Sequence, residues 1–389
     1  MKKYSILIVG LKCYSGHIRE FIVNLKKKNP QVDITLLTFF IRDKFKDDIT
    51  DSVNQIITLK RYRGRAKNSY FKKLMNIIYL KWGLIRLLFS YHFDIVDIHY
   101  PQGFLKYAMP ILRKMTNNIV LTPWGSDVMR IESKKSIEDL TKIYSQADHV
   151  TIGTTSKIGQ CAISKFKVDS KKMVKLGWGG EFFDFIQEKA QNVTTVSAKE
   201  RFGLKGRFVI TCGYNTQQEQ RHEDIVNAIY EVRDKLPKNL TLLFPFTYGR
   251  TSKSDKYTNL IIEKTKALGF DIRVVEDHLN MLDLLKLRMA TDVFVHVQDT
   301  DAGSRCVMEY VFCNKRIVHG AWTQYTYLED YKPSCYFPVD KMENLGNVIM
   351  KACNAQVGEL PQEVRNIILE RGWNHRMIKW NAFFESLVS

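Results

Sequence analysis

The chain has 389 residues, of which 45% are hydrophobic and 26% are charged. This composition excludes collagen, low-complexity disorder and a small disulfide scaffold, and the length indicates two domains that each bury a full core. Lysine and arginine total 59 against 41 acidic residues, so the formal net charge is +18. A charge of that size attracts phosphate-rich partners, such as nucleic acid, anionic lipid or an anionic substrate, and says nothing about the fold.

The cysteines and the apolar runs indicate the cellular compartment in which the protein is expected. Seven scattered cysteines without a C-x-x-C pair indicate reduced, cytoplasmic thiols and no metal knuckle. The apolar stretch near the N-terminus is short and lacks a small-residue cleavage site, which favours a first β-strand over a signal peptide. No run reaches ~18 uninterrupted apolar residues, so we expect no transmembrane helix.

Short apolar runs alternate with longer helical patterns along the chain, which is typical of parallel βα units. In the first half the expected strands are 5–9, 33–37, 55–59, 95–99, 118–122, 149–152 and 173–176. In the second half they are 208–212, 241–245, 271–275, 293–297 and 316–319. The expected helices between them include 17–28, 104–115, 223–235, 256–268, 281–289 and 304–312. The pattern predicts an α/β fold with two doubly wound, Rossmann-like domains.

The polar segment 187–205 has no strand pattern and is expected to link a first domain of residues 1–186 to a second of residues 206–372. Residues 373–389 form an amphipathic tail, expected to be helical. In doubly wound sheets the ligands bind at the carboxyl ends of the strands, so the candidate site residues are sought there.

Residues 299–320 carry the most informative motif. It follows an expected strand and opens a helix at about Ser304, whose unpaired N–H groups and positive dipole end suit a diphosphate. Asp301 and Glu309 are eight positions apart on the same loop and helix, so one acid can reach a sugar hydroxyl while the other accepts from a second pair of hydroxyls. Acids also decorate helix N-termini for purely structural reasons, and the spacing alone leaves both interpretations open.

This segment resembles the acid-x7-acid motif of retaining GT-B glycosyltransferases, especially those of family 4, with Asp301 and Glu309 as the two acids. The resemblance implies that Glu309 binds the nucleotide ribose and Asp301 the donor sugar. It further implies that two Rossmann-like domains face each other across a cleft and that the tail helix crosses back to the first domain. The backbone N–H groups implied to hold the diphosphate are those of Ala302, Gly303, Ser304 and Arg305.

The loop after the first strand of the second domain, residues 212–224, departs from the family pattern. The family usually carries Gly-Arg and then Lys-Gly here, and both cations grip the diphosphate. In this chain Tyr214 occupies the Arg position, which leaves Arg221 as the candidate catalytic cation. With residues 245–250, the loop also resembles the fucosamine transferases of enterobacterial common antigen synthesis, another GT-B group. The donor-binding candidates in these loops are Gly213, Tyr214, Asn215, Tyr248, Arg250 and, toward the nucleotide base, His278.

Two loops of the first domain supply candidates for the acceptor side of the cleft. Gly125 and Asp127 fit a segment in which the family often carries His-Gly, but Trp124 stands where the His would be. The alternative is a tight turn that caps the following helix. Gly16 and His17, after the first strand, are expected to line the same side.

Residues 60–93 contain nine cations and no acid, with aromatic residues interleaved. This pattern fits an interfacial helix on anionic lipid, and its composition would also suit a nucleic-acid surface. The alternative is an ordinary helix that packs Met75, Ile78, Trp82 and Ile85 inward behind a solvated basic face. We favour an anionic membrane, because a lipid-linked acceptor would supply one. The cations are Lys60, Arg61, Arg63, Arg65, Lys67, Lys72, Lys73, Lys81 and Arg86.

These features predict a glycosyltransferase that moves a sugar from a UDP-, GDP- or dTDP-sugar to a lipid-linked or saccharide acceptor. The expected setting is bacterial capsule, O-antigen or exopolysaccharide synthesis at the inner face of the cytoplasmic membrane. The enzyme is expected to retain anomeric configuration and to use no metal, cofactor or nucleic acid. The alternatives are a non-catalytic GT-B-like binding partner and a basic nucleic-acid-binding protein.

A different role is open to Asp299 and Asp301, which form a D-x-D triplet that could hold a divalent cation against a diphosphate. That device belongs to the other large glycosyltransferase fold, which has one nucleotide domain, whereas two βα domains are visible here. We therefore expect Asp299 to be dispensable.

Overall fold

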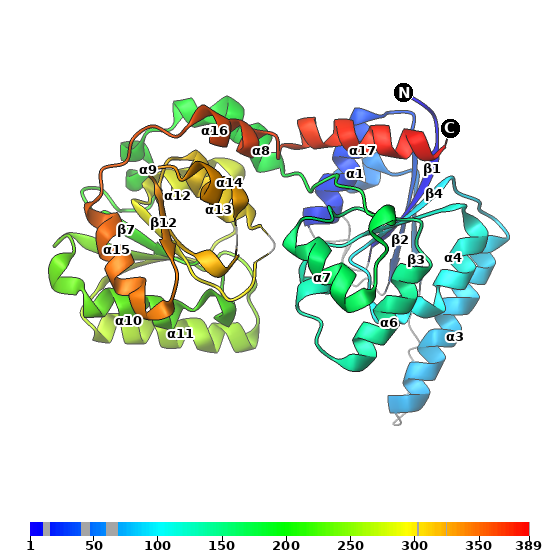
Figure 1. Ribbon diagram of the computed structural model, residues 1–389, viewed down its shortest axis with the longest axis horizontal. Coiled ribbons are helices and arrows are strands. Elements are labelled where there is room, and N and C mark those ends of the chain that lie inside the picture. The colour runs from blue at the N-terminus through cyan, green and yellow to red at the C-terminus, as the bar shows by residue number, and fades with distance from the viewer. Residues whose placement is uncertain (11–15, 40–46, 60–68, 302, 324, 389) are drawn as a thin grey trace. The chain divides into compact units, whose positions relative to one another are not determined.

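The computed structural model describes residues 1–10, 16–39, 47–59, 69–301, 303–323 and 325–388 (Figure 1). The chain divides into two compact units, Met1–Gly180 with Trp373–Ser389 and Glu181–Gly372. Each unit contains one six-stranded parallel sheet with helices packed against it. The α/β class and the two Rossmann-like sheets predicted from the sequence are confirmed.

The first sheet has the strand order β3-β2-β1-β4-β5-β6. Its strands are β1 (Ser5–Gly10), β2 (Asp33–Phe39), β3 (Gln55–Leu59), β4 (Ile95–His99), β5 (Asn118–Thr122) and β6 (His149–Val150). The α-helices of this part of the chain are α1 (Gly16–Lys28), α2 (Asp47–Ser52), α3 (Ser69–Leu88), α4 (Met109–Met115), α5 (Ser126–Met129), α6 (Lys134–Ser145) and α7 (Lys157–Phe166).

The second sheet has the order β12-β11-β10-β7-β8-β9, which is the same winding pattern repeated. Its strands are β7 (Phe208–Cys212), β8 (Leu240–Pro245), β9 (Asp271–Val275), β10 (Val293–His296), β11 (Arg316–Gly320) and β12 (Tyr336–Val339). Its α-helices are α8 (Glu181–Lys189), α9 (Thr195–Arg201), α10 (His222–Glu231), α11 (Ser252–Ala267), α12 (Met281–Ala290), α13 (Arg305–Phe312), α14 (Thr326–Tyr331), α15 (Leu345–Asn354) and α16 (Gln362–Leu369).

The segment 187–205, which the sequence predicts to be a linker, is instead largely helical and belongs to the second unit. It runs from the end of α8 through α9. Phe183 and Ile186 of α8 and Ala198 of α9 are buried in the core of that unit. The prediction is wrong because short helices with many charged outer residues show little apolar periodicity, although their inner faces pack fully.

Three other expectations about individual strands and helices are wrong. Residues 173–176 form no strand, since only an isolated bridge joins Met173 to Val150. The expected helix 104–115 is split into a 3-10 helix, Gly103–Tyr107, and α4, because Pro110 has no N–H to continue the ladder and sits in the first turn of α4. Strand β12 was missed because it contains Pro338, which is tolerated only because β12 lies at the edge of the sheet.

Each sheet is buried on both faces, as the continuous apolar strands require. In β1, Ile6 and Ile8 point into one core layer and Leu7 and Val9 into the other, which follows from the two-residue period of a strand. All four side chains are fully buried. The sheet therefore serves as the common wall of two separate apolar layers.

The last helix, α17 (Trp373–Leu387), packs against α1 in the first unit, although the whole second unit precedes it in the chain. Trp373 and Trp380 are buried in the same layer as Ile6 and Ile8. The Nε1 of Trp380 donates a hydrogen bond of 2.9 Å to the backbone carbonyl of Gly177. The tail thus completes the core of the first unit.

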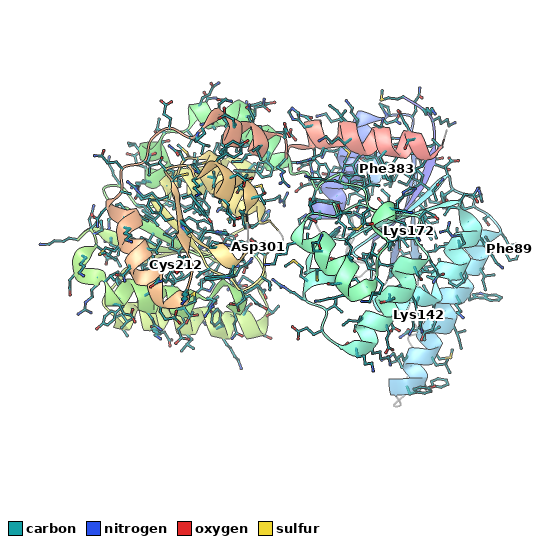
Figure 2. All side chains as sticks on the ribbon, in the orientation of Figure 1. Phe89, Lys142, Lys172, Cys212, Asp301 and Phe383 are labelled. Atoms are coloured by element: carbon teal, nitrogen blue, oxygen red, sulfur yellow. The ribbon has the colours of Figure 1, made fainter. Side chains whose placement is uncertain are left out.

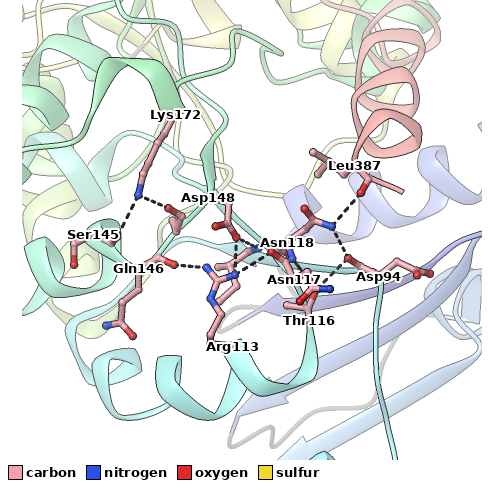
Figure 3. A network of polar contacts seen from close by, with 12 residues as sticks. Asp94, Arg113, Thr116, Asn117, Asn118, Ser145, Gln146, Asp148, Lys172 and Leu387 are labelled. Atoms are coloured by element: carbon pink, nitrogen blue, oxygen red, sulfur yellow. Dashed lines mark hydrogen bonds and ion pairs between the residues drawn. The ribbon is translucent and has the colours of Figure 1, made fainter. Parts of the chain in front are cut away.

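The end of α17 is tied to the first sheet by polar contacts (Figure 3). The side-chain amide of Asn118 donates to the carbonyls of Leu387 and Asp94, each at 3.1 Å. Beside it, the Asp148 carboxylate accepts from the backbone N–H of Ile119 at 2.7 Å and from Arg113 at 2.8 Å. These bonds fix the start of β5 and the end of the tail together.

Replacing Trp380 by Ala is expected to lower the free energy of unfolding of the first unit by about 3–5 kcal/mol, because it empties a large buried volume and removes a hydrogen bond. Chemical denaturation measures the change. Ile378→Ala is the control, since Ile378 lies on the same helix and is 53% exposed. Equal stability of the two variants would show that the tail helix does not contribute to the hydrophobic core of the first unit.

Candidate functional site

The candidate donor site lies at the carboxyl edge of the second sheet. Strands β7 and β10 are neighbours there, and the strand order reverses between them. Loops that leave neighbouring strands at such a reversal open a crevice in which ligands bind. Cys212 ends β7 and Asp301 follows β10, and both are labelled in Figure 2.

The loop after β7 begins with a glycine that the local geometry requires. Gly213 has φ +62°, and a Cβ at this position would lie 2.8 Å from Nε2 of His222. Any other residue would combine backbone strain with a clash. The N–H of Gly213 donates to the carbonyl of Val295 at 3.1 Å, which ties the loop to β10.

Tyr214 continues this link between the two strands. Its ring stacks on His296 at 5.6 Å between centroids, and its N–H donates to the Gln220 side chain at 3.1 Å. Gln220 in turn donates to Gln298 at 2.7 Å. The loops after β7 and β10 are therefore joined by a buried chain of contacts, of which the sequence predicted only Tyr214 as a site residue.

Asn215 and Tyr248 are brought together from the loops after β7 and β8. The Asn215 amide lies 3.4 Å from the Tyr248 hydroxyl, and the rings of Tyr214 and Tyr248 are 6.0 Å apart. The N–H of Thr216 donates to the Tyr248 carbonyl at 3.2 Å. His278, by contrast, is exposed in the loop after β9.

The two candidate cations of these loops already have carboxylate partners. Arg221 donates to Asp224 at 2.8 Å and to Asp299 at 2.9 Å. Arg250 pairs with Asp255 at 3.1 Å and with Glu276 at 3.0 Å. Asp299, which the sequence predicts to be dispensable, thus contacts Arg221 together with Asp224.

Asp301 is held at the N-terminal end of α13. The hydroxyl of Tyr325 donates to the Asp301 carboxylate and accepts from the N–H of Ser304 at 2.5 Å. Nε2 of His296 lies 3.3 Å from the same carboxylate. Ser304 caps α13, since its side chain accepts from the N–H of Cys306. Asp301 is therefore fixed beside the positive end of a helix dipole.

The other residues implied to hold the diphosphate are adjacent. Gly303 has φ +94° and is exposed, and a Cβ added there would have no atom within 4 Å. Arg305 opens α13 and is partly buried. Ala302 lies outside the described residues. Tyr325 was missed from the sequence because no motif distinguishes it among the aromatic residues after β11.

Three buried histidines surround this edge of the sheet. Desolvation by burial lowers the pKa of His222, of His296 and of His319 to about 3 in each case. The rings of His296 and His319 stack 5.5 Å apart. At neutral pH these imidazoles are uncharged, so positive charge at the site comes from arginines and from the N–H groups of α13.

Glu309 lies one turn further along α13, and the sequence did not predict its partner. Both it and Arg288 of α12 are buried, with side chains 7% and 6% exposed. The guanidinium donates to Oε2 of Glu309 through Nε at 2.9 Å and through a terminal nitrogen at 2.8 Å. Its other terminal nitrogen donates to the Tyr310 hydroxyl at 3.1 Å.

Both of these bonds end on one oxygen of Glu309, Oε2. Arg288 was missed because it sits within an ordinary helical pattern, 21 positions from Glu309.

No group of three or more metal-ligating side chains gathers anywhere in the ranges that the structure describes. Within the D-x-D triplet, the two carboxylates bind different partners. Asp299 contacts Arg221, and Asp301 contacts Tyr325.

The first unit has an aromatic cluster at the carboxyl edge of its sheet. The Trp124 ring lies 5.0 Å from His17, 5.3 Å from Tyr100 and 6.0 Å from Trp178. The His17 and Trp178 rings are 6.1 Å apart. The structure thus brings together the predicted residues His17 and Trp124 and adds Tyr100 and Trp178.

The backbone that carries Trp124 is fixed by its own loop. Asp127 accepts from the N–H groups of Trp124 at 2.9 Å and of Gly125 at 2.8 Å. Gly125 has φ +113°, which only glycine adopts readily. Gly16, by contrast, is exposed at the start of α1 and has open space around its Cα.

A buried polar network lies beneath this cluster. Nε2 of His99 is 3.0 Å from the Asp97 carboxylate, whose other oxygen accepts from Thr122 at 2.6 Å. His99 and Asp97 are fully buried. Among the residues described, nothing bonds to Nδ1 of His99 or to the buried Nε1 atoms of Trp124 and Trp178. Buried polar atoms normally have partners, and this cluster carries three that none of the described residues satisfies.

No protein-family model matches the chain, and no curated protein matches it in sequence. Solved structures do match over its full length. A glycosyltransferase from Rickettsia africae ESF-5 superposes with a TM-score of 0.73 at 14% identity and covers 100% of both chains. HepE of Anabaena, solved with UDP and glucose, gives 0.72 at 12% identity over 98% of this chain and 100% of its own.

A lipopolysaccharide outer core galactosyltransferase, WaaB, gives a TM-score of 0.67 at 12% identity over 98% of this chain and 99% of its own. At these identities the likeness establishes the fold. The chain has the GT-B fold of two Rossmann-like domains, as the sequence predicted.

Replacing Arg288 by Met is expected to lower the free energy of unfolding by about 3–5 kcal/mol, because it leaves the Glu309 carboxylate buried without its partner. The double variant Arg288→Met with Glu309→Leu should recover part of that loss. Urea denaturation measures both. Arg201→Met, which breaks an exposed pair with Asp283, is the control and should cost under about 1 kcal/mol. Glu309→Leu alone is the second single variant of the cycle, and strict additivity of the two single changes would mean that the pair is not coupled.

Proposed function

We propose that this protein is a glycosyltransferase that transfers a sugar from a nucleotide-sugar donor to an acceptor. The observation that carries the proposal is the placement of Asp301. Its carboxylate is held by Tyr325 beside the N-terminus of α13, at the reversal point of the second sheet. The full-length likeness to glycosyltransferases of the GT-B fold supports it.

In this proposal the second unit binds the donor. Asp301 contacts the sugar hydroxyls, and Oε1 of Glu309 accepts from the ribose while Arg288 holds Oε2. A charged acceptor next to a ribose contributes about 1.5–3 kcal/mol per hydrogen bond. Tyr214, Asn215 and Tyr248 bind the donor from the loops after β7 and β8, and His278 binds toward the base. Solved HepE binds UDP and glucose, which is consistent with a donor of this class.

The leaving diphosphate is stabilised without metal. The N–H groups at the start of α13 and the side chain of Arg305 face the developing charge. Arg221, released from Asp224 or Asp299, supplies a second cation. The neutral histidines around Asp301 cannot add charge, and no side chain is assigned as the base. With retention of configuration, the leaving phosphate itself takes the acceptor proton.

The first unit binds the acceptor. The aromatic cluster of His17, Tyr100, Trp124 and Trp178 offers ring faces for a sugar, and its indole N–H groups, which bond to no described residue, can donate to sugar hydroxyls. Trp124 therefore replaces the histidine that the family often carries by contributing stacking rather than charge. Gly125 and Asp127 fix its backbone, and Gly16 lies next to His17 at the start of α1.

The acceptor is lipid-linked or saccharide, and the pathway is bacterial surface polysaccharide synthesis. The similarity to a lipopolysaccharide galactosyltransferase supports this choice. The protein would then act as a peripheral protein at the inner face of the cytoplasmic membrane. None of the helices in the described ranges is long and apolar enough to cross a bilayer.

Glu309→Gln is expected to weaken nucleotide binding ten- to hundredfold, since it removes the charge from a hydrogen bond to ribose. Calorimetry with UDP, GDP and dTDP measures the affinity. Glu263→Gln, at an exposed position on α11, is the matched control. An unchanged affinity in Glu309→Gln would remove this residue from the site.

Asp301→Asn is expected to lower sugar transfer at least a hundredfold, and Asp299→Asn only a few-fold through the orientation of Arg221. Activity should persist in excess EDTA. Asp234→Asn, 96% exposed, serves as the control. The donor is first identified by a thermal-shift screen of UDP-, GDP- and dTDP-sugars.

Two results would contradict the proposal. Activity that EDTA abolishes and Mn²⁺ restores, with Asp299 and Asp301 equally essential, would show a metal-dependent D-x-D site. Donor binding without turnover on any acceptor would show a non-catalytic binding partner instead.

A further inference from the structure

Helix α3 presents an apolar stripe to solvent. Phe71 is 45% exposed, Ile78 47%, Trp82 65% and Ile85 37%, and Phe89, directly after the helix, is 85% exposed. Their spacing of seven, four, three and four residues places them on one face of an α-helix. Phe89 is labelled at the outer side of the first unit in Figure 2.

The opposite face of the same helix forms part of the core. Leu80 and Leu84 are buried with Leu59 of β3, so α3 has two apolar faces rather than one. The alternative in which Met75, Ile78, Trp82 and Ile85 pack inward behind a basic outer face is therefore wrong. A soluble surface rarely carries so many adjacent large apolar side chains, which indicates a binding surface.

The charges around the stripe have one sign. Lys72, Lys73, Lys81 and Arg86 are all exposed, and residues 69–93 contain no acid. The remaining cations of the predicted basic stretch, between residues 60 and 67, lie outside the described residues. The N-terminal end of α3 projects beyond the rest of the first unit (Figure 1), where Tyr70 is 75% exposed.

We propose that α3 docks the protein on an anionic lipid bilayer, with the stripe of Phe71, Ile78, Trp82, Ile85 and Phe89 inserted at the level of the headgroups. Lys72, Lys73, Lys81 and Arg86 then contact lipid phosphates. Apolar and aromatic side chains flanked by cations are the pattern of a helix that lies in a membrane interface. Aromatic rings favour that depth, and the lysine stems can extend to the phosphates.

A second copy of this chain fits the surface less well. A symmetric dimer through α3 would bring the four cations of each copy to one interface that contains no acid from this stretch. A bilayer that carries negative charge neutralises the same cations. The proposal that α3 binds a membrane does not depend on the proposed transfer reaction. The proposal of a lipid-linked acceptor does depend on that reaction.

The test measures binding of the full chain to vesicles. Phosphatidylcholine vesicles are compared with equimolar phosphatidylcholine and phosphatidylglycerol in a flotation assay at low salt. We expect binding only to the anionic vesicles, and loss of binding as the salt concentration rises. Changing Lys72, Lys73, Lys81 and Arg86 to Gln should weaken it roughly a hundredfold.

The apolar part is tested separately by Trp82→Gln with Phe89→Gln, which should weaken vesicle binding at least roughly tenfold. Leu260→Gln with Ile378→Gln changes two other exposed apolar residues and serves as the control. The charge control replaces Lys235, Lys238, Lys256 and Lys266, all exposed in the second unit. Donor binding, measured in parallel, reports on the proposed function independently.

Failure of the wild-type protein to bind anionic vesicles would overturn the proposal. So would control variants that lose binding as much as the α3 variants, because net charge alone would then explain it. A dimer in light scattering that Trp82→Gln with Phe89→Gln dissociates, without vesicle binding, would assign the surface to a second copy.

Discussion

The strand order of the two sheets is the constraint on which the rest of the structure depends. Each sheet reverses its winding between its first and fourth strands, at β1 and β4 in one unit and at β7 and β10 in the other. Loops at this point are released to opposite sides, and their side chains converge on the space between them. The loop after β7 meets β10 for this reason, through Gly213 with Val295 and Tyr214 with His296, although many residues separate them in the chain.

In the second unit, the two motif acids Asp301 and Glu309 have different hydrogen-bond partners. Asp301 is held by a neutral hydroxyl at a helix N-terminus, where the dipole favours its charge. Glu309 is held by a buried guanidinium, which donates two hydrogen bonds to one of its oxygens. Around them burial keeps the histidines uncharged. The site therefore concentrates positive potential in a few arginines and backbone N–H groups, which suits a diphosphate.

The first unit combines two surfaces of different chemistry. Its sheet edge carries an aromatic cluster that contains the buried indole N–H groups of Trp124 and Trp178, to which no described residue bonds, and α3 carries an apolar stripe among cations. The tail helix α17 returns to this unit and buries two tryptophans in its core. The proposed acceptor and membrane surfaces are thus part of one folded body whose core the last residues of the chain complete.

The sequence by itself determined the fold class, the two sheets and the location of the motif acids. These follow from local signals, because apolar strands, amphipathic helices and a glycine turn between strand and helix are determined by residues that lie close together in the sequence. It also identified Gly213, Tyr214, Trp124 and Asp127, which the structure places at the strand ends.

Only the tertiary structure decided which side chains meet. Arg288 faces Glu309, Tyr325 holds Asp301, and Trp178 joins Trp124, all across elements whose contacts no local pattern encodes. The sequence did not predict the helices within 187–205, because their charged outer faces leave little apolar periodicity. It did not predict the edge strand β12, because Pro338 is unusual in a strand. In α3 the sequence shows apolar residues all around the helix, and periodicity cannot tell which face is buried. Packing against Leu59 settles it, because one face fits the core and the other is left in water.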